Sequence, residues 1–221
     1  MKQPESELTL RERVNSGLSR NWKLAVLILC LVVVAMAAIL ILDKVGKVRT
    51  ADAAMAAEDI EDAYLDWTKA APEDRDDDAV DALIDKALSD YPKLFAAQRA
   101  YFTRGLMALE KEEWTDAAEA FETLASTWKD SYLAPVSLFN AGSAREQAGD
   151  IDAAVALWSE LVDKYADVSP DAPETLFNLG RVAESRGDAE GALGYYGDIA
   201  AKYPDSRWTD LAKSRILSIE D

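Results

Sequence analysis

The sequence of 221 residues contains no histidine and only one cysteine, Cys30. Without histidine, the Ser-His and Cys-His nucleophile pairs and histidine metal sites are excluded. A lone cysteine cannot form an internal disulfide, so cysteine usage does not indicate the redox compartment. No glycine-rich phosphate loop follows a predicted strand, and no pattern indicates a pocket that would perturb the many carboxylates. We therefore expect no enzymatic activity, no cofactor and no metal.

Positive charge is scarce after the first 50 residues. Residues 1–50 contain 8 Lys/Arg and 4 Asp/Glu, so their net charge is +4. Residues 51–221 contain 16 Lys/Arg and 37 Asp/Glu, so their net charge is −21. A negative field of this size repels phosphate backbones, which excludes nucleic acid as an expected partner. The same field keeps the acidic part soluble and favours basic partners.

A single long apolar run lies near the N-terminus, behind a short polar tail at residues 1–23. It extends from Leu24 to Leu42 without a charged residue. As a helix it would be about 28 Å long, which is close to the hydrocarbon thickness of a bilayer. Trp22 and charged residues flank it, as interfacial anchors do. The run is too long for a cleavable signal peptide. A bacterial lipoprotein signal needs a small residue immediately before its cysteine, and here Leu29 precedes Cys30. We predict an uncleaved transmembrane helix at residues 24–42.

The orientation of this helix is predicted from the charges beside it. Near the span, four Lys/Arg stand on its N-terminal side and three on its C-terminal side: Arg11, Arg13, Arg20 and Lys23, then Lys44, Lys47 and Arg49. Because cytoplasmic flanks carry the excess of Lys/Arg, the N-terminus is expected in the cytoplasm. We therefore expect a single-pass protein of the cytoplasmic (inner) membrane, with its acidic domain on the extracytoplasmic side, which is the periplasm in a Gram-negative host.

A repeated pattern fills most of the acidic part. Residues 138–142 read LFNAG and return as LFNLG at 176–180, with a looser copy, YFTRG, at 101–105. Each glycine is followed at fixed spacing by an alanine and then an aromatic residue: Ala117 and Phe121, Ala154 and Trp158, Ala192 and Tyr196. A period of 37 to 38 residues with two helices per unit is typical of a helical repeat array.

The repeat predicts an all-α solenoid of about four helix pairs with a capping helix at 207–219. Three pairs are expected at 94–129, 132–166 and 171–204, and an earlier one from 51–70 and 79–90. Between the halves of that first pair, the acidic run at 73–78 lacks the spacing, central glycine and terminal glutamate of an EF-hand. We expect a solvated loop there, with its last aspartates capping the next helix. The predicted division is a transmembrane helix at 24–42, a juxtamembrane helix and acidic loop at 43–78, and the array at 79–221. Whether residues 44–70 belong to the array is left open.

The Gly, Ala and aromatic spacing resembles tetratricopeptide repeats (TPRs) over residues 79–221. An N-terminal anchor followed by such a domain is similar to the ancillary subunit family of the Sec translocon. The repeats also look like those of the Tol–Pal cell-division coordinator and of outer-membrane assembly lipoproteins.

The resemblance also implies a site, because the first helix of each TPR unit lines a groove that binds other proteins. By register, the groove-facing candidates are Phe102, Phe139, Asn140, Phe177 and Asn178. The asparagine amides have the donors and acceptors needed to bond both groups of an extended peptide backbone. The alternative is that Phe139 and Asn140 serve only packing and capping between repeats.

Two functional classes follow from the resemblance. The first is a chaperone-like adaptor, accessory to the translocon, that binds unfolded clients. The second is a structural adaptor for envelope assembly, cell division or cell-wall machinery, without holdase activity. Both classes have other proteins as partners, and the sequence does not indicate the oligomeric state.

Overall fold

The computed structural model describes residues 22–220, and this part of the chain is helical, without a strand. It divides into two compact units, the first ending at Asp52 and the second extending from Ala53. The helices are α2 (Trp22–Lys69), the 3-10 helix η1 (Pro72–Asp74), α3 (Asp77–Asp90), α4 (Phe95–Glu110), α5 (Trp114–Thr127), α6 (Leu133–Gln147), α7 (Ile151–Tyr165), α8 (Ala172–Ser185), α9 (Ala189–Lys202) and α10 (Arg207–Glu220).

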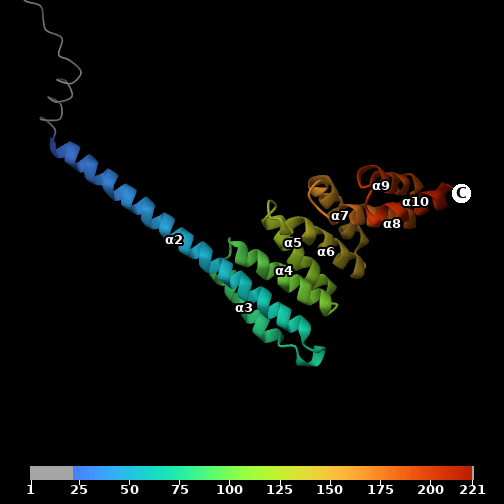
Figure 1. The fold of residues 1–221 in the computed structure, drawn as a ribbon, viewed down its shortest axis with the longest axis horizontal. Helices are drawn as coiled ribbons and strands as arrows, with labels where there is room; N and C mark the ends of the chain where they lie inside the picture. The colour runs from blue at the N-terminus through green and yellow to red at the C-terminus, as the bar shows by residue number, and fades with distance from the viewer. Residues whose placement is uncertain (1–21, 221) are drawn as a thin grey trace, which may run out of the picture. The chain divides into compact units, whose positions relative to one another are not determined.

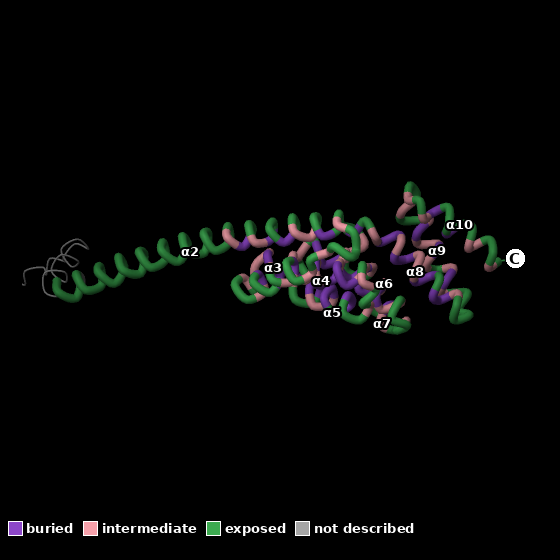
Figure 2. Tube along the Cα trace, turned by 90° about the horizontal axis from the view of Figure 1, so that it is seen from below, coloured by how far each residue is buried: buried purple, intermediate pink, exposed green. Residues whose placement is uncertain are grey.

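The first unit, as far as it is described, consists of residues 22–52 of α2. The described side chains in this stretch are exposed apart from that of Asp52, which is partly buried, and Figure 2 shows the N-terminal part of α2 in the colour of exposed residues. An apolar helix normally hides one face against a core. This one has no protein core around it, and it is long and apolar enough to cross a membrane. The predicted tail at residues 1–23 lies almost wholly outside the described residues.

In the second unit, α3 to α10 follow one another as packed neighbours (Figure 1), and the buried residues lie between them (Figure 2). The pairs α4–α5, α6–α7 and α8–α9 coincide with the three predicted units, and α10 coincides with the predicted capping helix. The all-α solenoid predicted from the repeat is therefore confirmed.

The second unit begins with the last turns of α2. Ala53, Ala57 and Ile60 are buried in one cluster with Val80 and Ile84 of α3. The division predicted at residue 79 stays a prediction, but residues from Ala53 onward share the core of the array. A helix pair forms here because the apolar residues of α2 recur at helical spacing and face those of α3.

Polar contacts also bind the end of α2 to α3 and α4. The Trp67 indole N–H donates to Asp77 Oδ1 at 2.6 Å, and Lys111 Nζ lies 2.7 Å from Asp77 Oδ2. The Arg75 guanidinium stacks on the Trp67 ring, 4.0 Å from its centroid. At the end of the acidic loop, Asp76 accepts a hydrogen bond from the Ala79 N–H, so the predicted cap is present.

The turns inside the helix pairs share one geometry. Gly149 and Gly187 have φ of 85° and 75°, which is the left-handed conformation that favours glycine. The residues that follow them, Asp150 and Asp188, accept hydrogen bonds from backbone N–H groups of α7 and α9. The α4–α5 turn has Glu112 in the left-handed position, with φ 59°, and no side-chain cap on α5. The α4–α5 turn thus lacks both the glycine and the side-chain cap that the two later turns have.

Candidate functional site

The five residues predicted to face a groove lie on the first helix of three successive pairs. Phe102 is on α4, Phe139 and Asn140 are on α6, and Phe177 and Asn178 are on α8. All five side chains are half-buried. They therefore keep the expected register, one set per helix pair, with part of each side chain accessible.

The phenylalanine rings are also packing residues. Phe102 meets Phe121 edge-on, with 5.6 Å between ring centroids. Phe177 lies between Tyr196 and Trp208, at centroid distances of 5.4 Å and 5.0 Å. Such pairs contribute about 0.5–1.5 kcal/mol beyond their burial. Substituting these phenylalanines would thus alter the fold as well as any groove.

The asparagines differ from the phenylalanines in having free polar groups. Neither Asn140 nor Asn178 forms a side-chain hydrogen bond with another described residue. The third residue in this register, Thr103, is only 2% exposed, so α4 presents no equivalent polar group. The candidate hydrogen-bonding surface is therefore restricted to α6 and α8.

A cavity of about 430 Å³ adjoins Phe177. It is lined by Phe177, Arg181, Glu184, Ser185, Tyr196 and Arg215, which come from α8, α9 and α10. Two aromatic rings, two guanidinium groups and one carboxylate thus surround a single hollow. The rings supply apolar surface, and the charged groups surround it with hydrogen-bonding capacity.

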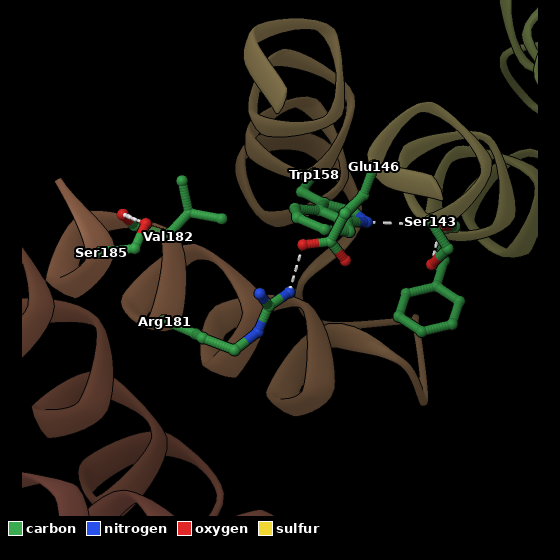
Figure 3. Close-up of polar contacts among 7 residues, drawn as sticks. Ser143, Glu146, Trp158, Arg181, Val182 and Ser185 are labelled. Carbon is green, nitrogen blue, oxygen red and sulfur yellow. Dashed lines mark hydrogen bonds and ion pairs between the residues drawn. The ribbon is translucent and has the colours of Figure 1, made fainter. Parts of the chain in front are cut away.

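The charged groups around this cavity are already paired. Arg181 donates to Glu146 Oε1 at 2.5 Å, which links α8 to α6 (Figure 3). Arg215 of α10 forms two hydrogen bonds with Glu184, and the Tyr196 hydroxyl donates to the same carboxylate at 3.1 Å. A bound carboxylate would have to displace Glu146 or Glu184, because neither guanidinium is without an anion.

The pKa of the Tyr196 hydroxyl is raised, chiefly because burial disfavours the phenolate, while Arg181 has an opposing, lowering effect. The hydroxyl therefore stays protonated at neutral pH and acts as a donor to Glu184. Tyr165 and Tyr203 also have raised pKa values, with burial as the largest cause. These tyrosines are hydrogen-bond donors of the framework, and none is poised to act as a base.

Sequence reasoning did not place Arg215 beside this cavity. Arg181 is on α8 with Phe177 and Asn178, whereas Arg215 belongs to α10, which does not repeat the pattern of α4, α6 and α8. Periodicity therefore could not place Arg215 beside Glu184. The sequence showed only that the predicted capping helix carries an arginine. It did not show which residue of the preceding helix this arginine would contact, because the capping helix is outside the repeat.

The predicted membrane anchor residues are all on α2. Their large apolar side chains are more than half exposed: Trp22 is 59% exposed, Leu24 55% and Leu42 70%. An apolar helix with such exposure is consistent with a lipid environment rather than a protein core. Among residues 22–220, no group of three or more His, Cys, Asp or Glu is placed to hold a metal ion.

Residues 139–207 match the family model of the tetratricopeptide repeat. They extend from Phe139 in α6 to Arg207 at the start of α10 and thus include the α8–α9 pair in full. This match and the all-helical fold support a tetratricopeptide repeat protein. Such repeats are typically non-catalytic modules that bind other proteins. No curated protein matches the chain.

Proposed function

We propose that the protein is a membrane-anchored scaffold that binds extended segments of other proteins along α6 and α8. The observation that carries this proposal is the pair of half-buried asparagines, Asn140 and Asn178, which have no hydrogen-bond partner among the described residues. Each follows a partly exposed phenylalanine, so a peptide would meet an amide and an apolar surface at the same register in two successive units. An amide side chain accepts and donates at once, which suits a peptide group.

We further propose that these segments belong to unfolded or newly exported clients, and that the protein is an accessory of the protein translocon. The apolar run of residues 24–42 supports a position at a membrane, and the excess of Lys/Arg on its N-terminal side favours the cytoplasmic membrane with the array on the extracytoplasmic side. Clients in an extended state present the free backbone groups and apolar side chains that α6 and α8 would bind. The strongly acidic array would keep such complexes soluble.

A client-aggregation assay tests the role of the asparagines. The full-length protein in nanodiscs is mixed with a denatured client protein on dilution, and light scattering is followed. We expect wild-type protein to slow aggregation and the double variant Asn140→Ala, Asn178→Ala to slow it several-fold less. The matched control, Ser89→Ala with Ser218→Ala, removes two exposed polar side chains on α3 and α10 and is expected to behave as wild type.

If the two double variants slowed aggregation equally well, Asn140 and Asn178 would not contribute to client binding. No effect of wild-type protein on any client would rule out the holdase and leave the structural adaptor for envelope or division proteins. The packed state of Phe102 and Phe177 favours that second candidate, because rings engaged with their neighbours offer less surface to an unfolded chain. Affinity purification from membranes separates the two, since translocon subunits or division and cell-wall proteins would copurify.

The orientation has its own test. Protease added to intact spheroplasts is expected to degrade the array, which is then detected as loss of a C-terminal epitope. Complete protection of the epitope, with degradation only after the membrane is permeabilised, would place the array in the cytoplasm. That result would overturn the extracytoplasmic location without affecting the peptide-binding proposal.

A further inference from the structure

A second cavity, of about 400 Å³, lies between α3, α4 and α5. Its apolar surface is formed by Met107, Ala108 and Ala120, beside the half-buried ring of Tyr101. Its other lining residues are polar: Asp81, Arg104, Lys111, Glu113, Asp116, Glu119 and Thr123. The cavity involves the second helices of two pairs, α3 and α5, so it is separate from the surface formed by Asn140 and Asn178.

One position at this junction departs from the repeat. Arg104 precedes Gly105, whereas the residues that precede the two later glycines are Ala141 and Leu179, both buried. Arg104 extends to Asp85 of α3, with 2.7 Å between Nη2 and Oδ1, and its side chain lines the cavity.

The cavity has an excess of unpaired negative charge. Its two cations are both neutralised by α3, because Arg104 pairs with Asp85 and Lys111 pairs with Asp77 at 2.7 Å. Four carboxylates line the cavity, and none of them forms an ion pair with another described residue: Asp81, Glu113, Asp116 and Glu119. Glu113, Asp116 and Glu119 are exposed along one side of α5. Carboxylates clustered around a hollow attract a cation more strongly than scattered surface charges do.

We propose that this cavity binds a basic segment of a partner protein by accepting a lysine or arginine side chain. The aliphatic stem would lie against Met107 and Ala120, and the cationic end would lie among the carboxylates of α5. The cavity's volume suits one or two side chains rather than a folded element. Charge complementarity selects the partner, because these carboxylates would repel an acidic segment and a neutral segment would leave them unpaired.

Binding of a synthetic basic peptide tests the proposal. The probe is a fluorescein-labelled helical peptide of lysine and alanine, and fluorescence anisotropy is measured with the full-length protein in a neutral detergent. We expect binding at 50 mM NaCl that weakens at least tenfold at 300 mM NaCl. A peptide with glutamate in place of lysine is expected not to bind.

Charge-neutral variants then locate the site. The triple variant Glu113→Gln, Asp116→Asn, Glu119→Gln is expected to bind the lysine peptide at least tenfold more weakly. The matched control Glu190→Gln, Asp205→Asn, Asp210→Asn makes the same change of charge at exposed, unpaired carboxylates of the last units and is expected to change the affinity less than twofold. Equal losses in the two variants would show attraction by net charge alone and would overturn the proposal.

A blocking variant keeps the test valid if the triple variant loses its fold. Thr123→Trp places a large side chain into the cavity from a half-buried position on α5 without changing the charge. We expect it to reduce peptide affinity at least fivefold while the helical circular dichroism signal is retained. Unchanged affinity in the folded Thr123→Trp variant would show that no side chain enters the cavity and would equally overturn the proposal.

Discussion

The indole ring of Trp158 in α7 lies directly on Gly142 of α6. A Cβ added at Gly142 would lie 2.3 Å from Trp158 Nε1, and that N–H donates to the Phe139 carbonyl at 3.3 Å. Figure 3 shows the ring beside α6, with its nitrogen directed at that helix. Phe121 and Tyr196 cover Gly105 and Gly180 in the same way. Glycine and aromatic residue thus form one packing element, repeated in three units.

We predict that Gly142→Ala destabilises the array although alanine is the better helix former. The gain in helix propensity is about 1 kcal/mol. Overpacking against a fully buried ring costs about 1–3 kcal/mol, because the rigid indole has no space to move into. The expected net loss is up to about 2 kcal/mol in the free energy of unfolding, measured by urea denaturation with circular dichroism.

Gly194 in α9 is the matched control, because nothing lies within 4 Å of a Cβ added there. Gly194→Ala is expected to stabilise the array by about 0.5–1 kcal/mol through helix propensity alone. If both substitutions stabilised the protein, the packing between Gly142 and Trp158 would have room for a methyl group at position 142, and the prediction would be wrong.

The difference between these glycines also shows what sequence could establish. The period places Gly142, Ala154 and Trp158 at recurring positions and predicts the order of helices. It does not show that each aromatic ring covers the glycine of its own pair. Spacing along the chain gives the face of a helix, but the direction of a large side chain within that face depends on three-dimensional packing. Gly194 does not recur, since Glu119 and Ala156 stand at its position in the other units.

A second prediction concerns the α4–α5 turn. Glu112 adopts φ 59°, a conformation that costs a non-glycine residue about 1–2 kcal/mol. Glu112→Gly is therefore expected to raise the free energy of unfolding by about 1 kcal/mol, since glycine also loses more chain entropy on folding. In the converse test, Gly149→Ala is expected to lower it by a similar amount. A destabilising effect of Glu112→Gly would mean that its side chain supports the turn.

The candidate sites were less predictable than the helices. Phe177, Asn178 and Arg181 share α8, but Arg215, which also borders the cavity beside them, comes from α10, a helix of different sequence pattern. The cavity near Arg104 is likewise a departure from the repeat, since only that unit has arginine where the others have alanine and leucine. A repeat predicts the residues that its units share. A cavity formed around a residue that only one unit has, such as Arg104, cannot be predicted from the repeat, because the side chains that contact this residue come from other helices.

A third prediction concerns acid stability. The pKa of Asp77 is lowered, first by the hydrogen bond from Lys111 and then by that from Trp67. Because the folded pKa lies below the unfolded value of about 4, the stabilisation is complete above that pH and is lost as pH falls through the lower folded value. Asp77→Asn is expected to reduce the free energy of unfolding at pH 7, by no more than about 1 kcal/mol, because solvent screens this half-exposed pair.

The pH dependence of the variant is the decisive measurement. The difference between wild type and Asp77→Asn is expected to be constant from pH 5 to pH 7 and to shrink below pH 4. Asp81→Asn is the control, because Asp81 forms no ion pair among the described residues. A difference that stayed the same down to pH 2 would exclude the Asp77 charge as its source.

A fourth prediction concerns two tyrosine hydroxyls that join successive units. Tyr165 donates to the Lys129 carbonyl at 2.8 Å, and Tyr203 donates to the Ala166 carbonyl at 3.0 Å, so equivalent bonds recur one period apart. Tyr203→Phe and Tyr165→Phe remove the donor and keep the ring. Each is expected to lower the free energy of unfolding by about 0.5–1.5 kcal/mol.

Tyr132 provides the control for these hydroxyls, because it is 68% exposed and its hydroxyl has no hydrogen bond to another described residue. Tyr132→Phe is expected to change stability by less than about 0.5 kcal/mol. Hydrogen exchange of the backbone amides gives a local readout: Tyr203→Phe is expected to speed exchange in α7 to α9, and Tyr165→Phe in α5 to α7. Since each unit of a solenoid contacts only its neighbours, the two regions differ. Faster exchange spread evenly over the array in both variants would show that these bonds do not act at single junctions.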